Sequence, residues 1–174
     1  MIAALRLLLC LMCAALAAAG PAHAQATNSD GSATVEVYSP FVLTKERDLD
    51  FGNIIVPGTG NGWVRINPGQ PDGSEIQVNG PFTTFGTAHS ARFNFIAPTD
   101  GRVVIRRPPG RRFLTRVGGT ERMRIRRWRL DRRARVRVQQ GDLVTFEVGA
   151  TINVGTNQAE GLYEAEFPIT VEYL

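Results

Sequence analysis

Apolar and polar residues alternate in short runs along most of this chain. The alternation is visible over residues 34–38, 48–51 and 92–95, and its longest run covers residues 163–173. In that run, apolar side chains take the odd positions, while Glu and Thr take most of the even ones. A period of two indicates a strand with one buried face and one wet face. Pro168 lies on the wet face and has no N–H, so we expect the strand to be unpaired or bulged there.

Clusters of Gly, Pro and Asn separate these runs. Beyond the N-terminal region, no segment combines a helical period over a dozen residues with capping residues at its ends. Several short strands at close turn spacing therefore predict an all-β sandwich or barrel. The turn clusters are at residues 56–62, 67–69, 79–81, 108–110, 118–119 and 140–142.

The N-terminus has the pattern of an export signal. A weakly positive start is followed by an apolar run over residues 7–19, and a small-x-small tripeptide ends at Ala24. An apolar run of this length is shorter than the roughly 20 residues that span a bilayer. We therefore expect residues 1–24 to be a signal peptide cleaved after Ala24, followed by a flexible segment at 25–32. Such a protein is periplasmic, surface-bound or extracellular.

The mature chain is expected to fold without disulfides. Cys10 and Cys13 both lie in the signal, and neither follows the small residue that a lipoprotein signal requires, so we predict no lipid anchor. A chain of 150 residues buries enough surface to be stable without crosslinks. We expect one domain over residues 33–174, with no transmembrane segment.

Candidate catalytic chemistry is sparse. His89 is the single histidine of the mature chain, and Ser90 beside it would point to the opposite face of a strand. Asp48 and Asp50 are a weak candidate for a paired-acid hydrolase. The glycine loop at 58–62 lacks the Lys-Ser/Thr of a phosphate-binding loop. We therefore expect no enzyme activity, no metal and no cofactor, with a hydrolase as the weakest alternative.

Charge is distributed very unevenly. Residues 102–137 contain 15 Arg and two acids, a net charge of +13, whereas the rest of the mature chain carries −10. We expect a hairpin with a loop at 131–133 and a bulge at Arg126-Arg127, and an amphipathic helix over 121–138 is the alternative. The candidate polyanion-binding residues on this hairpin are Arg122, Arg124, Arg127, Arg129, Arg135 and Arg137.

Like charges that face each other across a sheet destabilise it by a few tenths to about 1 kcal/mol per pair. Solvent and salt, the acidic face of residues 163–173, or an external anion would each compensate for this repulsion. Trp128 shares the apolar face of the predicted hairpin, which favours a place in the core over stacking on a base or sugar.

Two segments carry a family resemblance. Leu-Asp-Phe-Gly at 49–52 with Val-Pro-Gly at 56–58, and the segments 148–154 and 157–163, are similar to the opening and closing motifs of a bacterial exported family, domain of unknown function 4402. The similarity extends over most of residues 33–174. Our interpretation of these motifs is structural. The glycines Gly52 and Gly161 allow sharp turns or close packing, and the aromatic residues Phe51 and Tyr163 fill the core.

The resemblance implies a single immunoglobulin-like antiparallel β-sandwich of about 7–10 short strands, from the envelope of a Gram-negative bacterium. It implies no catalytic residues. The first hypothesis is therefore a structural or adhesive envelope protein, pilin-like or adhesin-like, that contacts other envelope proteins or its own copies through opposite charges. Residues 25–32 lack the alternation of a donated strand. The second is a module that binds lipopolysaccharide, acidic polysaccharide or nucleic acid through its arginines.

Overall fold

The computed structural model describes residues 42–71 and 74–174, and the regular elements in these two ranges are all β-strands. The predicted signal peptide, the segment at 25–32 and the alternating run at 34–38 lie outside the described residues. The all-β prediction is confirmed, although the described part of the chain has thirteen strands. They are β1 (Leu43–Arg47), β2 (Asn53–Ile55), β3 (Gly62–Ile66), β4 (Ile76–Asn79), β5 (Thr83–Phe85), β6 (Ala91–Ile96), β7 (Gly101–Arg106), β8 (Arg112–Arg116), β9 (Arg122–Leu130), β10 (Arg135–Val138), β11 (Leu143–Val154), β12 (Tyr163–Glu164) and β13 (Thr170–Tyr173).

Strand β11 is the centre of the largest sheet. Its first half pairs with β6 and its second half with β3 along one edge, while β9 pairs with its middle along the other edge. The sheet continues in the order β1-β6-β11-β9-β8-β12, and all of these pairings are antiparallel. Residues 146–152 of β11 are buried without interruption, which means that both faces of this strand are covered.

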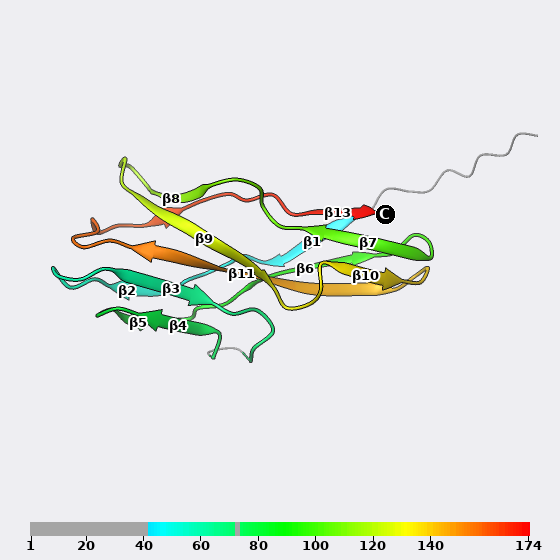
Figure 1. Cartoon of the computed structure of the whole chain (residues 1–174), viewed down its shortest axis with the longest axis horizontal. Helices are drawn as coiled ribbons and strands as arrows, with labels where there is room; N and C mark the ends of the chain where they lie inside the picture. Colours follow the sequence, from blue (N-terminus) through cyan, green and yellow to red (C-terminus); the bar gives the residue numbers. More distant parts are fainter. Residues whose placement is uncertain (1–41, 72–73) are drawn as a thin grey trace, which may run out of the picture. The chain divides into compact units, whose positions relative to one another are not determined.

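A second sheet, β10-β7-β13, contributes to a core cluster with the first half of β11, and β2 pairs with β5 in a small ribbon. Figure 1 shows β10 next to the first half of β11, and β3 next to its second half. Two apolar clusters form the core. The first joins β6, β7, β10 and β11, and the second joins β3, β9 and the end of β11. Leu49 and Trp128 pack against both clusters, and Trp128 contacts Phe167 with ring centroids 4.7 Å apart. Trp128 therefore belongs to the core, as its alternation predicts.

The C-terminal run at 163–173 keeps its alternation but divides between two sheets. Tyr163 and Glu164 pair with β8, whereas residues 170–173 pair with β7. Residues 165–169, including Pro168, have no ladder partner, which agrees with the interruption expected from a proline. The segment therefore connects the two sheets as one extended stretch.

The predicted arginine hairpin is wrong. Strand β9 pairs with β8 and β11, and β10 pairs with β7 in the other sheet, so neither Arg129 and Arg135 nor Arg127 and Arg137 face each other. The bulge at Arg126 is confirmed, because the register of β9 against β11 shifts there. The helical alternative is also excluded, since β9 is a strand of nine residues.

Two contacts explain why the hairpin does not form. The backbone N–H of Asp131 donates to the carbonyl oxygen of Glu147 at 3.2 Å, and the Asp131 carboxylate accepts the N–H of Glu147 at 2.9 Å. These bonds hold the end of β9 on β11. Beyond them, Val138 is buried in the first core cluster and Val136 packs against it, so hydrophobic burial draws β10 to β7.

We expect Gly149→Ala to lower the free energy of unfolding by about 1–3 kcal/mol, because an added methyl group would overpack the sheet. A Cβ at Gly149 would overlap the backbone oxygen of Ile66 and lie 2.7 Å from Cδ of Pro68. Gly155→Ala is the control, since the nearest atom to its Cβ would be 3.7 Å away. Urea unfolding of both variants measures the difference, and equal stabilities would contradict the close packing at Gly149.

Candidate functional site

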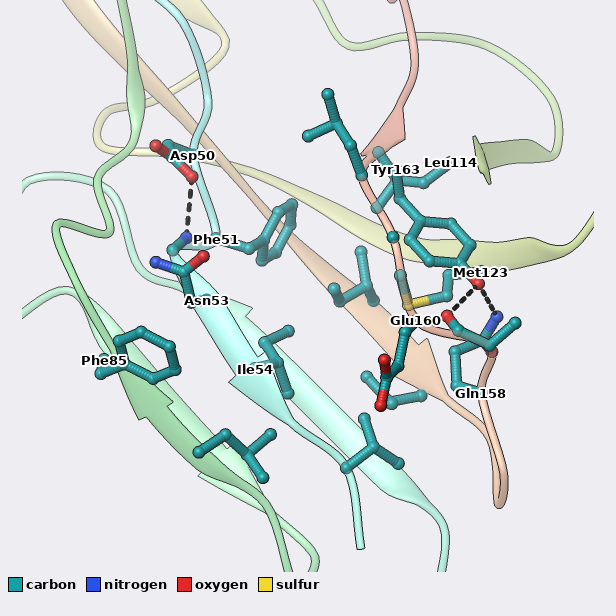
Figure 2. Close-up of a pocket in the computed structure, with 18 of the residues that line it drawn as sticks. Asp50, Phe51, Asn53, Ile54, Phe85, Leu114, Met123, Gln158, Glu160 and Tyr163 are labelled. Atoms are coloured by element: carbon teal, nitrogen blue, oxygen red, sulfur yellow. Dashed lines mark hydrogen bonds between the residues drawn. The ribbon is translucent and has the colours of Figure 1, made fainter. Parts of the chain in front are cut away.

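The two segments that resemble the family motifs meet at one apolar cleft. Residues 49–56, which include β2, form one wall, and residues 158–163 form the other. Side chains of Leu114, Met123 and Ile152 also line the cleft, which has a volume of about 650 Å³. Figure 2 shows Phe51 and Ile54 on one side and Leu114, Met123 and Tyr163 on the other.

The first wall is fixed by a turn at Asp50. The N–H and carbonyl of Asp50 pair with the backbone of His89, both at 2.9 Å, and its carboxylate accepts the N–H of Gly52 at 2.8 Å (Figure 2). Gly52 has a φ of 67°, which favours glycine, and a Cβ there would lie 3.0 Å from the carbonyl oxygen of Phe85. The turn directs Phe51 into the second core cluster. The structural interpretation of this motif is confirmed.

The second wall is fixed by Tyr163. Its hydroxyl donates to the carbonyl oxygen of Ala159 at 2.7 Å and accepts a hydrogen bond from the Gln158 side chain at 2.7 Å (Figure 2). Its ring packs against the second core cluster, as predicted. Gly161 has a φ of 140°, which supports the predicted sharp turn. The Tyr163 hydroxyl and the Gln158 amide are thus used to hold the backbone of this wall.

The cleft is lined mostly by apolar side chains, with polar groups among them. Asp50 and Glu160 are two acids of this lining, and Ile55, Phe85 and Leu162 are exposed hydrophobic side chains in it. Within residues 42–71 and 74–174, no group of three or more His, Cys, Asp or Glu side chains is arranged to hold a metal ion. The chemistry of the cleft suits an apolar chain segment that carries positive charge at its edges.

A buried ionic network covers the face of β11 that lies opposite to the Phe146 side chain. The Arg47 guanidinium lies 3.1 Å from the Glu75 carboxylate and 3.5 Å from that of Glu147. The hydroxyl of Ser90 donates to Glu147 at 2.9 Å, and its backbone N–H donates to Glu75. Because both carboxylates are buried and multiply bonded, this network holds β1, β6 and β11 to the loop before β4.

Glu147 has additional donors. Arg92 contacts its carboxylate at 2.7 and 3.0 Å, and the backbone N–H of Gly69 donates to it at 2.8 Å. Burial by itself raises the pKa of Glu147, but these bonds and the one from Ser90 outweigh burial and hold the pKa below its ordinary value. Glu147 is therefore a structural anion, with its lone pairs occupied by neighbouring donors.

The six candidate arginines do not form one surface. Met123 and Ile125 are buried, so Arg122 and Arg124 point to the outer face of the large sheet. Arg127 and Arg129, which follow the bulge, also lie on this outer face, across β11 from Arg65.

Arg135 and Arg137 lie on β10, on the outer face of the other sheet, where Arg137 is directly opposite Arg102.

Acidic side chains compensate for only part of the repulsion between these arginines. On the β10-β7-β13 sheet, Glu172 pairs with Arg106 at 2.6 Å. On the large sheet, Arg65 lies on the same face as Arg127 and Arg129. The sequence analysis did not identify Arg65, because this residue lies outside the arginine-rich segment.

Asp48 and Asp50, two of the weaker catalytic candidates, each have a structural partner. Asp48 pairs with Lys45 at 2.6 Å, while Asp50 binds the turn at Gly52, so the two carboxylates have different partners. The buried Nδ1 atom of His89 has no hydrogen-bond partner among the described residues. In the same part of the chain, no helix is long and apolar enough to cross a membrane.

These features define a class of protein: an all-β domain with antiparallel sheets and an apolar cleft built by its two motif segments. The chain belongs to the family described as Domain of unknown function (DUF4402), whose model matches residues 41–173. The resemblance seen in the sequence is thereby confirmed. No curated protein and no solved structure matches the chain.

We expect Glu147→Gln to lower the free energy of unfolding at neutral pH by about 2–3 kcal/mol, because charged hydrogen bonds to Arg92 and Ser90 are lost. Since the pKa of Glu147 is lowered on folding, its contribution is complete above about pH 4.5 and is lost as the pH falls below that value. Urea unfolding across the acid range should show a shallower pH dependence in the variant.

Glu172→Gln is the matched control for this prediction. Glu172 and Arg106 form an ion pair in which both side chains are largely exposed, so its loss should change stability by at most about 1 kcal/mol. If both variants lost the same stability, the buried network would have no special role.

Proposed function

We propose that this protein is an exported, non-enzymatic component of the bacterial envelope with a structural or adhesive role. The finer fold that we propose is a single immunoglobulin-like β-sandwich of the pilin or adhesin kind. The predicted export signal in residues 1–24 and the membership of the DUF4402 family support this proposal. The family's description assigns no function, and the support for an assembly role comes from the cleft.

The observation that carries the proposal is the chemistry of the motif segments. Asp50, Gly52 and Tyr163 hold their own turns, and together the two walls leave an apolar cleft open. Residues that build an open apolar surface and engage no reactive group are suited to assembly.

We propose a second copy of this chain as the occupant of the cleft. The lining of the cleft includes Asp50 and Glu160, whereas residues 102–137 of another copy carry a net charge of +13. Opposite charges would orient the copies, and the apolar walls would supply the free energy of contact. Because the two surfaces differ, the contact is head-to-tail and can extend into a chain of subunits.

Export is tested by fractionating Gram-negative cells that express the full chain. We expect the protein in the periplasm or on the cell surface, with Gln25 as its first residue. N-terminal sequencing of the exported fraction measures this. A full-length chain that stays in the cytoplasm would overturn the envelope assignment.

Assembly is tested with Leu162→Lys in the exported protein. Leu162 lines the cleft and is 62% exposed, so a positive charge there, which repels the arginine-rich segment of the other copy, should weaken self-association at least tenfold with little effect on folding. Size-exclusion chromatography with light scattering measures the mass. The wild type should be larger than a monomer at low salt and smaller at high salt, because salt screens charges beyond about 8–10 Å.

Leu143→Lys is the matched control. Leu143 is 65% exposed on β11 and lies outside the lining of the cleft, so this variant should associate like the wild type. A monomeric wild type at every salt concentration, or equal loss in both variants, would overturn self-assembly through the cleft.

A further inference from the structure

We propose that Arg65, Arg127 and Arg129 form an anion site that binds the phosphate or sulfate groups of an acidic glycan. This site lies on the outer face of the large sheet and goes beyond the proposed assembly function. None of its three arginines lines the apolar cleft.

The register of the sheet brings the three arginines together. Arg65 on β3 and Arg127 on β9 are both directly opposite Thr151 of β11. Two strand spacings put their backbones roughly 10 Å apart, within the reach of two arginine side chains toward one ligand. Arg129 follows Arg127 by two residues and shares its face.

Arg65 is held in place by its neighbours. Its guanidinium lies over the ring of Trp63, 4.3 Å from the ring centroid, and its Nε donates to the Thr151 hydroxyl at 3.2 Å. Burial, followed by the charges of Arg129 and Arg127, lowers the pKa of Arg65 below its ordinary value. Arg65 remains cationic at neutral pH, so the three guanidinium groups repel one another until an anion binds between them.

Arg129 supplies an unused donor. Its Nε is buried and has no hydrogen-bond partner among the described residues. Among the described residues that line this hollow, the one acid is Asp131, which already accepts the backbone N–H of Glu147 and lies 3.6 Å from Arg132. A buried donor without a partner is energetically unfavourable, and a ligand oxygen would satisfy it.

Arg129 lies between two hollows of about 530 and 470 Å³. The first hollow contains amide and hydroxyl groups that can bind sugar hydroxyls. Its described lining residues include no aromatic side chain. The second adds further arginines, so a chain of charged sugars could continue across Arg129. Trp128 also lines the second hollow, but its ring packs against Phe167 in the core with centroids 4.7 Å apart. The lining therefore favours an acidic glycan over a nucleic acid, whose bases need free rings for stacking. Polar side chains of the first hollow are Asn67, Gln70, Ser74 and Gln77, and the arginines of the second are Arg107, Arg126, Arg127 and Arg129.

The test measures binding of a fluorescent, sulfated heparin hexasaccharide to the exported protein. The double variant Arg65→Gln/Arg129→Gln should bind at least tenfold more weakly, because two charge-assisted contacts are removed. The matched control is Arg102→Gln/Arg137→Gln, which removes two facing arginines from the other sheet. It should stay within about twofold of the wild type.

The exposed residue Arg127 gives a second variant, Arg127→Gln, should the double variant fail to fold. An equal loss in the control pair would overturn the site, because net charge alone would then explain binding. No binding by the wild type would overturn it as well. A single-stranded oligonucleotide that binds as tightly as the hexasaccharide would overturn the assignment to a glycan. Leu162→Lys leaves all three arginines in place, so it should bind the hexasaccharide like the wild type, which separates this test from self-assembly.

Discussion

Burial of both faces of β11 is the constraint on which the rest of the fold depends. One face carries Phe146 and Val148 into the first core cluster, which the β10-β7-β13 sheet helps to form. The other face carries Glu147 and Gly149, so it must be covered without leaving a charge unpaired. The network of Arg47, Glu75 and Ser90 meets this requirement, and Gly149 allows the loop after β3 to lie directly on the strand.

Features that follow from local alternation could be predicted from the sequence. Neighbouring residues show the buried and exposed faces of the segments 92–95 and 163–173, the bulge at Arg126 and the core position of Trp128. Pairing between strands is a different question, because many alternating segments are equally compatible with each other. The hairpin prediction was wrong since nothing within residues 121–138 reveals that Asp131 binds Glu147, 16 residues further along the chain.

The sites were harder to predict because their residues are also far apart in the sequence. Arg47 contacts Glu75 and Glu147, which are 28 and 100 residues away in sequence. The family motifs marked both walls of the apolar cleft, but only the folded chain brings residues 49–56 against 158–163. The charge count identified a basic segment, whereas the fold distributes it over the outer faces of two sheets and adds Arg65 to one of them.

The passage of residues 163–173 from one sheet to the other affects when the molecule can finish folding. Strands β12 and β13 cover the last open edges of β8 and β7. Residues 163–173 follow β7 and β8 in the chain, so each of these two strands has an unprotected edge until the later segment has been made. Exposed edges attract foreign strands. A chain with this order therefore benefits from delayed folding until residues 163–173 can pair with both sheets.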